Sequence, residues 1–482
     1  MGPVRALGFG LALAPLFPPL ALLSPLFLPW LRRLEPLAKV LLGLYALSVL
    51  IPALFAPEPL ALPLALGRVL YVLSLVGMGV ALAHGKKPEQ ALAPLGPGLL
   101  LLFASAFLAS YLTFGDKVTE NRLMHPFHSP VGLGFMGTLG LLLALYIRYP
   151  WPFRLLLGLL GGATLLLSAS RGGLLALLLA GSGGLLFRGR SLMLLGLAGL
   201  LLFTASLLDN PLTERFFQTH LSGREGLWLR AHEVFQAQPW SGVGPYVLGD
   251  YLQGTLFPGC FLFPLLEARG LSCPEWLRPF GGFWSFAHNH LLQALGESGL
   301  PGALGLLLLV GAFLGAAWGE GLLFSGLLAF AAMGMTDNPF SVPSPFRGEI
   351  FFLLGGMALS RGVRLPSALA LGGVVALLWA LPFFYLATRP PSPPPALRYA
   401  ALPPGKGVGF LQFAGGEGYR VQVWLCGKTC QRLGWEWSGS ELVRFTFPQD
   451  LPRGRYTLRV LLFSPHRLAL KPRYTLEWEV KR

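Results

Sequence analysis

The chain of 482 residues is 54% hydrophobic and only 12% charged, and its formal net charge is +15. Soluble domains carry about 25% charged residues, so a single soluble core is excluded and most of the chain must lie in lipid. The positive charge does not indicate nucleic-acid binding, because no basic stripe with interleaved aromatic residues occurs. A positive-inside bias and contact with anionic membrane lipid explain the charge instead.

Twelve windows of apolar sequence approach the length that a membrane-spanning helix requires, which is about 20 residues. They are residues 6–28, 37–55, 61–83, 97–114, 131–147, 153–169, 172–187, 191–208, 298–318, 321–336, 348–360 and 366–387. Pro15, Pro18, Pro19 and Pro25 interrupt the first window, so a kinked span or a re-entrant hairpin is expected there. This window lacks a convincing small-residue cleavage site, which favours a retained membrane segment over a signal peptide. The predicted fold class is mainly α, a polytopic integral membrane helical bundle of about twelve spans.

The short connections that carry basic residues all fall on one side when the predicted spans are counted. These residues are Arg32, Arg33, Lys39, Lys86, Lys87, Arg148, Arg154, Arg188, Arg190, Arg361 and Arg364. The positive-inside rule assigns that side to the cytoplasm. The extracytoplasmic side then receives the C-terminus and four connections: residues 115–130, 168–172, 209–297 and 337–347.

The C-terminal part of the chain changes from helical to alternating sequence. Residues 388–395 are rich in proline and cannot continue a helix, so they predict a linker after a transmembrane domain of residues 1–387. Period-two alternation between turn residues then predicts strands at 418–426, 441–447, 454–463 and 473–480, with a fifth at 407–415. We therefore expect an extracytoplasmic all-β, sandwich-like domain over residues 396–482.

This predicted β domain carries 14 Lys and Arg against 6 Asp and Glu, a net charge of +8. One interpretation is a solvated accessory domain that rests on anionic lipid. The other is a module that binds a partner or a glycan, and the sequence does not separate the two.

The four cysteines all fall in segments predicted to face outward. Cys260 and Cys273 lie in the long loop, and Cys426 and Cys430 lie in the tail. An even pair in each outward segment predicts two disulfides in an oxidising compartment. A metal site built on the CxxxC spacing is the rival interpretation, but no second cysteine or histidine pair stands at ligand spacing.

Arg171 stands between two apolar runs in LLLSASRGGLLALLLA. Gly172 and the glycine after it let a backbone approach a ligand closely, and a helix that begins here offers unpaired N–H groups to an anion. An anion site is therefore predicted at Arg171. The alternative is an arginine that reaches lipid headgroups by snorkelling.

Arg224 follows a Ser-Gly helix-start signal. The helix predicted after it carries an apolar stripe, formed by Leu227, Trp228, Ala231, Val234 and Phe235, and should lie along the membrane interface. A cation in the first turn is unfavourable for the helix dipole, and a bound phosphate would explain its presence. An ordinary surface arginine is the alternative.

His288 and His290 flank Asn289 just before an apolar run. A neutral imidazole at a membrane surface can take a proton from a hydroxyl nucleophile near pH 7, although a hydrogen-bonded structural histidine is the alternative. Two histidines two residues apart do not share a helix face and no third ligand is evident, so no metal site is expected.

The connection FGDKVTENRLMHPFHSPVG adds Arg122, His125 and His128 to the same predicted side of the membrane. These residues either extend a basic rim around the site or cap the helices that they join.

Together these stretches resemble the O-antigen ligase/polymerase superfamily of integral membrane glycosyltransferases, which are of the GT-C type. The matching stretches are SASRGG, SGREGLW followed by AQPWSGVGP, AHNHLLQALGESGLPG and, more loosely, RLMHPFHSPVGLG. They occur in the order expected for the family and span residues 120–302. Residues 1–110 match only in hydropathy, and the β-rich tail lies outside the shared core.

The resemblance implies an activity at the outer, periplasmic face of the bacterial inner membrane. It implies transfer of a glycan from a polyprenyl (undecaprenyl) diphosphate carrier to an acceptor hydroxyl on a lipid or surface polymer, with inversion and without a metal or another cofactor. His288 is then the catalytic base. Arg171 and Arg224 bind the diphosphate, with Arg122 as a weaker third cation, while Asn289, His290, Gly172 and His125 support them.

Four other functions stay open. A polymerase of the same superfamily extends the growing glycan, and a protein O-oligosaccharyltransferase modifies Ser or Thr. A transporter or flippase performs no covalent chemistry, but it predicts charges near the middle of the membrane and two similar halves. This sequence shows no such repeat, and its candidate charges gather at the outward rim. A structural membrane scaffold would bind no phosphate lipid through Arg171 and Arg224.

Overall fold

The computed structural model describes residues 3–184, 190–207, 216, 224–252 and 285–388, and in the C-terminal part residues 396–401, 408–414, 420–427, 430–437, 442–447, 454–463 and 474–481. The chain divides into two compact units, Met1–Ala380 and Leu381–Arg482. Each unit is described by itself below.

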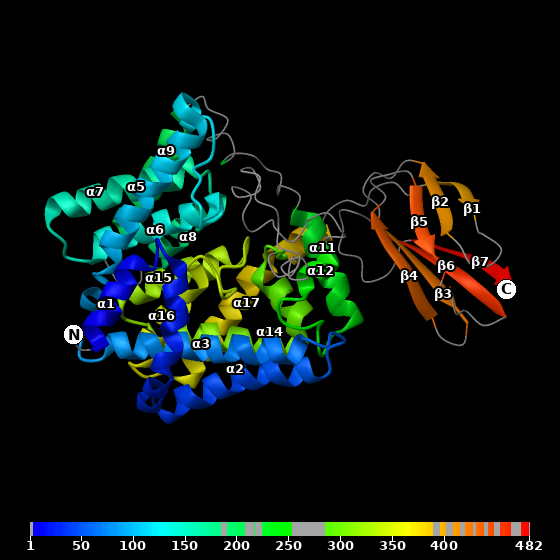
Figure 1. Ribbon diagram of the computed structural model, residues 1–482, viewed down its shortest axis with the longest axis horizontal. Coiled ribbons are helices and arrows are strands. Elements are labelled where there is room, and N and C mark those ends of the chain that lie inside the picture. The colour runs from blue at the N-terminus through cyan, green and yellow to red at the C-terminus, as the bar shows by residue number, and fades with distance from the viewer. Residues whose placement is uncertain are drawn as a thin grey trace. The chain divides into compact units, whose positions relative to one another are not determined.

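The first unit is built of helices (Figure 1). In chain order they are α1 (Pro3–Leu13), the 3-10 helix η1 (Pro18–Arg33), α2 (Pro36–Leu54), α3 (Ala61–Ala83), α4 (Pro88–Leu92), α5 (Leu95–Phe114), the 3-10 helix η2 (Gly115–Thr119), α6 (Pro130–Tyr146), α7 (Trp151–Leu167), α8 (Arg171–Gly184), α9 (Arg190–Leu207), α11 (Arg224–Ala237), α12 (Leu248–Leu252), α14 (His290–Ala316), α15 (Gly321–Met333), α16 (Arg347–Leu359) and α17 (Leu365–Thr388).

Within the described ranges, five helical segments are long and apolar enough to cross a membrane. They are Pro36–Leu54, Ala61–Ala83, Pro88–Lys117, His290–Ala316 and Leu365–Tyr385. Five more apolar helices are shorter, from Pro130–Tyr146 to Gly321–Met333. The prediction of a mainly helical integral membrane protein is confirmed, whereas the number of twelve spans stays a prediction.

The N-terminal segment is interrupted after Leu13, and whether it forms a kinked span or a re-entrant hairpin stays a prediction. A short α1 is followed by η1, a 3-10 helix of 16 residues with Pro25 and Pro29 inside it. Repeated prolines remove the backbone donors of an α-helix, so the chain adopts the tighter 3-10 winding instead. η1 packs closely on α3, because a Cβ at Gly77 would meet the carbonyl group of Phe27.

Glycines allow several helices of the first unit to approach closely. A Cβ on Gly79 of α3 would meet the carbonyl of Leu353 in α16, and a Cβ on Gly356 of α16 would meet the carbonyl of Val76 in α3. Small residues at helix contacts let backbones pack closely where lipid supplies no hydrophobic driving force. The α14 helix packs against α2, and α2 runs beside α3 (Figure 1).

The C-terminal unit holds two antiparallel sheets. One has the order β1 (Ala396–Ala401), β2 (Val408–Ala414), β5 (Leu442–Thr446), and the other has the order β4 (Cys430–Trp437), β3 (Arg420–Cys426), β6 (Arg455–Phe463), β7 (Tyr474–Lys481). Buried residues of both sheets, among them Leu411, Phe445, Val423 and Val460, form one hydrophobic cluster. A small C-terminal β region is thus confirmed.

Two strands of this unit were not predicted. β1 follows the proline-rich stretch directly, and β4 contains Gly434, which weakens the strand pattern. Cys426 and Cys430 face each other across the β3–β4 hairpin and are joined by a disulfide. Cys260 and Cys273 lie outside the described residues.

Candidate active site

The start of α14 organises the polar residues of the first unit. Asn289 caps this helix, because its side-chain oxygen accepts a hydrogen bond from the Leu292 N–H at 3.0 Å. Its Nδ2 donates to the carbonyl oxygens of Met335 (3.0 Å) and Trp379 (2.9 Å). Asn289 is fully buried. These contacts anchor the backbone next to His288, and the supporting role of Asn289 in the reaction stays a prediction.

His288 forms a hydrogen-bonded pair with Asp337. Its Nδ1 lies 3.1 Å from Asp337 Oδ1, and about a third of the imidazole (34%) is exposed. An ionised carboxylate only accepts hydrogen bonds, so the proton of a neutral His288 resides on Nδ1 and the lone pair on Nε2. The backbone of His288 is left-handed, with φ 52°. Its carbonyl oxygen accepts a hydrogen bond from Trp228 Nε1 at 3.3 Å.

Asp337 lies between three cationic or ionisable groups. Besides His288, Arg347 Nη1 lies 3.5 Å from Asp337 Oδ2, and the charge of Arg224 acts on the same carboxylate. Burial alone would raise the pKa of Asp337, but the hydrogen bond from His288 and the charges of His288, Arg347 and Arg224 hold that pKa well below its usual range. Asp337 is therefore ionised at any physiological pH.

Thr336 lies against the segments that carry two of the predicted cations, Arg171 and Arg224. Its carbonyl oxygen accepts a hydrogen bond from Arg224 Nη1. Its hydroxyl oxygen lies 3.1 Å from the position that a Cβ on Gly172 would take. Because α8 begins at Arg171, the start of that helix lies against the same loop as Arg224 and His288. Three segments far apart in sequence thus meet at Thr336 and Asp337.

Arg122 and the two histidines of its loop lie on neighbouring backbone. Arg122 Nε donates to the Ser168 carbonyl at 2.8 Å, which ties this loop to the turn before Arg171. His128 is buried and its Nε2 donates to the Pro15 carbonyl at 2.7 Å, while the ring of His125 lies 5.2 Å from that of His128.

Burial lowers the pKa of both loop histidines. The pKa of His125 falls to about 4 through desolvation. The pKa of His128 falls to about 3, mainly through desolvation and further through the charges of His125 and Arg347. Both imidazoles are therefore neutral near pH 7, and His128 acts in the structure as a hydrogen-bonding group rather than as a cation.

His290 points away from His288 into the interior. It is buried, its ring meets Phe340 edge-on at 4.6 Å, and its Nδ1 lies 3.5 Å from Asn338 Nδ2. The backbone N–H of His290 donates to the Gly334 carbonyl at 2.8 Å. The two histidines therefore occupy different surroundings, as their spacing of two residues predicts.

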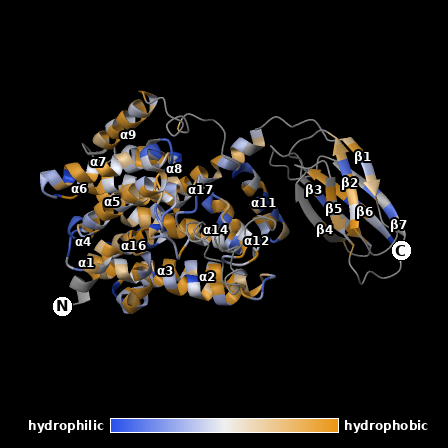
Figure 2. Cartoon of the chain, turned by 45° about the horizontal axis from the view of Figure 1, so that its top comes forward, coloured by the Kyte–Doolittle hydropathy of each residue, from blue (hydrophilic) through white to orange (hydrophobic). Residues whose placement is uncertain are grey.

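The α11 helix packs against α14 through its apolar stripe. Trp228, Ala231 and Val234 are buried, and Arg230 on the other side donates to the Leu252 carbonyl at 3.0 Å. The prediction of a helix that lies along the interface did not foresee this packing, because a stripe on a helix does not reveal whether it meets lipid or protein. Figure 2 shows blue and white residues along α11, whereas α2, α3 and α5 are largely orange.

Sequence reasoning missed Asp337 and Arg347. Both stand in the connection predicted to face outward, in TDNPFSVPSPFRGE. An acidic and a basic residue in a Pro-rich loop between two apolar windows were the available signal, but a single Asp has no spacing that marks its partner. Residues 334–346 form the connection between α15 and α16 and are called the α15–α16 loop below.

The helices and this site define the class of the protein: an integral membrane protein in which polar and cationic side chains gather around a histidine–aspartate pair. Residues 155–307 match the family model described as O-antigen ligase, Wzy_C. Over this range the predicted resemblance to the O-antigen ligase superfamily is confirmed, and members of that family are membrane glycosyltransferase-like ligases and polymerases. No match is found among curated proteins.

The matched range contains Arg171, Arg224 and His288 but ends before Asp337 and Arg347. The α15–α16 loop supplies Asp337 and the start of α16 supplies Arg347, so the site is completed from beyond the matched segment.

Proposed function

We propose that this protein transfers a glycan from a polyprenyl diphosphate carrier, undecaprenyl diphosphate in bacteria, to an acceptor hydroxyl. The observation that carries the proposal is the His288–Asp337 pair, which leaves Nε2 of a partly exposed imidazole as the acceptor of a proton. The family match supports the reaction class, because its members join lipid-linked glycans to acceptors.

The proposed step is a single displacement. His288 Nε2 removes the proton of the acceptor hydroxyl as its oxygen attacks the anomeric carbon of the donor glycan. The bond from that carbon to the diphosphate oxygen breaks, and the diphosphate lipid leaves with the electron pair. Attack opposite the leaving group inverts the anomeric configuration. Asp337 orients His288 and stabilises the imidazolium that forms.

Cations stabilise the charge that grows on the leaving diphosphate. We assign this role to Arg224 and Arg171, whose segments meet at Thr336, and a weaker one to Arg122, which is tied to Ser168. The positive end of the α8 dipole adds to the positive potential beside Arg171. Arg347 adds a further positive charge on the other side of Asp337.

Substitution of His288 tests the proposal. Replacing His288 with Ala should lower transfer from the native lipid-linked glycan fraction by about 10²–10⁴-fold, the usual contribution of a general base. Binding of undecaprenyl diphosphate in nanodiscs should stay unchanged. Transfer at the wild-type rate would remove His288 as the base, whereas a wild-type protein without any transfer activity would favour a transporter.

The arginines should show the opposite pattern. An Arg171→Ala/Arg224→Ala variant should bind undecaprenyl diphosphate more weakly by about 10²–10⁴-fold, because each charged hydrogen bond contributes about 1.5–3 kcal/mol. Unchanged binding would contradict the diphosphate assignment and would fit a membrane scaffold.

The identity of the acceptor is tested by leaving the separate acceptor out of the reaction. We propose a lipid or surface-polymer acceptor, as in an O-antigen ligase. Purified protein incubated with lipid-linked repeat units alone should then form no ladder of products. A ladder would identify a polymerase, and transfer to Ser or Thr of an added protein would identify an O-oligosaccharyltransferase.

The proposed reaction implies an arrangement in the bacterial inner membrane. We propose that the shorter apolar helices also cross the bilayer, for about twelve spans over residues 1–387, and that the site faces the periplasm. Residues 388–395 then link this domain to a periplasmic β sandwich over residues 396–482. Cysteine labelling from either side of the membrane, at residues placed in the α15–α16 loop and beside Arg361, would test the orientation.

A further inference from the structure

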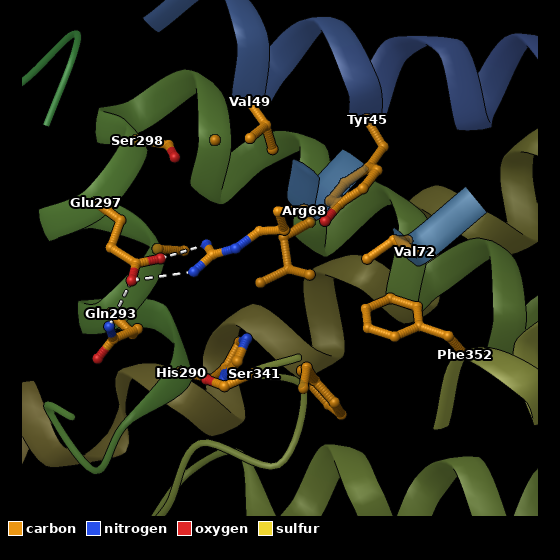
Figure 3. A pocket seen from close by; sticks show the side chains of 14 residues that line it. Tyr45, Val49, Arg68, Val72, His290, Gln293, Glu297, Ser298, Ser341 and Phe352 are labelled. Atoms are coloured by element: carbon orange, nitrogen blue, oxygen red, sulfur yellow. Dashed lines mark hydrogen bonds and ion pairs between the residues drawn. The ribbon is translucent and has the colours of Figure 1, made fainter. Parts of the chain in front are cut away.

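Beside the site lies a second polar cluster, built around the ion pair of Arg68 in α3 and Glu297 in α14 (Figure 3). The two side chains are joined by two hydrogen bonds, and Gln293 Nε2 donates to Glu297 Oε1 at 2.8 Å. The pair is buried, with 14% of the Arg68 side chain and 3% of the Glu297 side chain exposed. A small pocket lies beside it, lined also by Tyr45, His290 and Ser341.

Tyr246 completes this cluster from another part of the chain. Its ring lies under the Arg68 guanidinium, 4.0 Å from ring centre to carbon, and its backbone N–H donates to Glu297 Oε1 at 2.9 Å. Its hydroxyl donates to the carbonyl oxygen of Val342 in the α15–α16 loop. Tyr246 therefore contacts α3, α14 and the loop that carries Asp337, and it holds a left-handed backbone with φ 68°.

The backbone around Tyr246 is docked on a break in α14. Gly299 (φ 63°) interrupts the helix, and the carbonyls of Gly296 and Glu297 accept hydrogen bonds from the N–H groups of Val243 and Gly244, both at 2.9 Å. A Cβ on Gly242 (φ 61°) would meet the Glu297 backbone, so this segment needs glycine to approach.

Val342 lies between the two site residues of its loop. Asp337 precedes it and Arg347 follows it at the start of α16, and a Cβ on Gly348 would lie 2.6 Å from the Ser341 carbonyl oxygen. With the loop packed this closely on α16, a hydrogen bond to Val342 limits how far Asp337 can move relative to α14. His288 is attached to the first turn of α14, so the distance between His288 and Asp337 depends on this hydrogen bond.

We propose that Tyr246 is a positioning residue for the transfer reaction. It ties the α15–α16 loop to α14 through Val342 and through the Arg68–Glu297 pair, and thereby holds Asp337 against His288. This inference rests on the proposed function, because it requires His288 and Asp337 to act together in the reaction. Tyr246 is assigned no direct part in the reaction, since its hydrogen bonds described above go to Glu297 and Val342.

The test compares two tyrosines of the same segment. Tyr246→Phe removes only the hydroxyl that reaches Val342, and Tyr251→Phe removes a hydroxyl that donates to Glu58 Oε1 at 2.6 Å, away from the α15–α16 loop. Full-length protein is assayed for transfer from the native lipid-linked glycan fraction. Tyr246→Phe should lower kcat about 3- to 10-fold, the range for one hydrogen bond, with the KM for the donor unchanged. Tyr251→Phe should leave kcat unchanged.

A second comparison separates positioning from a general loss of structure. In an Asp337→Asn background, Tyr246→Phe should have no further effect on kcat. The Asp337→Asn change has already impaired the contact between residues 288 and 337 that Tyr246 is proposed to hold in place. A purely structural role would add its loss in both backgrounds. The double variant Arg68→Met/Glu297→Gln removes both charges while keeping similar volumes, and it should also lower kcat with KM unchanged.

The outcomes of the two proposals are distinct. The absence of transfer by the wild-type protein would overturn the proposed function, and wild-type transfer by His288→Ala would overturn the mechanism assigned to His288. Equal kcat for Tyr246→Phe and Tyr251→Phe, with His288→Ala inactive, would overturn only the positioning role. An effect of Tyr246→Phe on KM alone, or an additive effect in the Asp337→Asn background, would also overturn it.

Discussion

Two buried charge networks lie on either side of the first turns of α14, and they differ in balance. The outer network joins Asp337 to His288, Arg347 and Arg224, so one carboxylate faces two guanidiniums and an imidazole. The inner network joins Arg68 to Glu297, and one charge of each sign cancels.

We assign the proposed reaction to the outer network and the support of the fold mainly to the inner network. The outer network keeps a surplus of positive charge and a partly exposed imidazole, and both are useful only when an anion and a hydroxyl arrive. The inner network satisfies Glu297 with Arg68, Gln293 and the Tyr246 N–H, which is the form in which a buried charge can persist. We expect changes in the outer network to act mainly on the rate of transfer. Changes in the inner network should act mainly on stability, with a smaller loss of kcat because Tyr246 links this network to the α15–α16 loop.

The largest effect is expected from Asp337→Asn. An amide in place of the carboxylate can hold the imidazole in the wrong tautomer, so kcat should fall by about 10²–10⁴-fold, close to the loss from His288→Ala. The melting temperature in detergent should change little by comparison. A rate near that of the wild type would show that the pair does not act as a unit, and the comparison between the networks would fail.

A large loss of stability is expected from Arg68→Ala. It leaves the carboxylate of Glu297 buried without its cation, which costs about 3–5 kcal/mol. The double variant Arg68→Met/Glu297→Gln should recover most of this loss, because neither charge then remains. Thermal unfolding in detergent should give a higher melting temperature for the double variant than for Arg68→Ala. Equal melting temperatures for Arg68→Ala and the wild type would show that the inner network is not supporting the fold.

The smallest expected effect is a loss of stability at low pH caused by His128, which lies beside the outer network. His128 has a pKa of about 3 in the folded protein, against about 6.5 when unfolded. The unfolded chain therefore binds the proton first, so this stability is present above pH 6.5 and is lost as pH falls toward 3. Between pH 7 and pH 5 the loss from His128 should be about 2 kcal/mol.

His128→Gln checks this assignment. Glutamine can still donate to the Pro15 carbonyl but does not titrate, so the variant should lose less stability than the wild type between pH 7 and pH 5. Melting curves at the two pH values measure the difference. The same pH sensitivity in both proteins would assign it to another group.

The sequence predicted the helical membrane unit and the β-rich tail because both depend on local patterns. Apolar length marks helices such as α2 and α3, and alternation marks strands such as β6. Strand β4 was missed because its alternation is weak around Gly434, and η1 was missed because no local rule distinguishes a long 3-10 helix from a kinked α-helix.

The candidate site was predictable only in part. Arg224 and His288 stand in polar segments bounded by helix-start signals, so each could be found alone. Asp337 could not be paired with His288, nor Glu297 with Arg68, because residues 49 and 229 positions apart meet only in the folded chain. Long-range pairing of single charges leaves no trace in spacing or hydropathy.

The left-handed backbone of His288 makes this residue unfavourable where it stands. A side chain with a Cβ in that conformation costs about 1–3 kcal/mol, and glycine would avoid most of the cost. His288→Gly should therefore melt at a higher temperature than His288→Ala, although both are expected to be inactive. A higher melting temperature for His288→Gly would show that the histidine at this position lowers the stability of the fold. Selection for stability alone would then replace His288 with glycine.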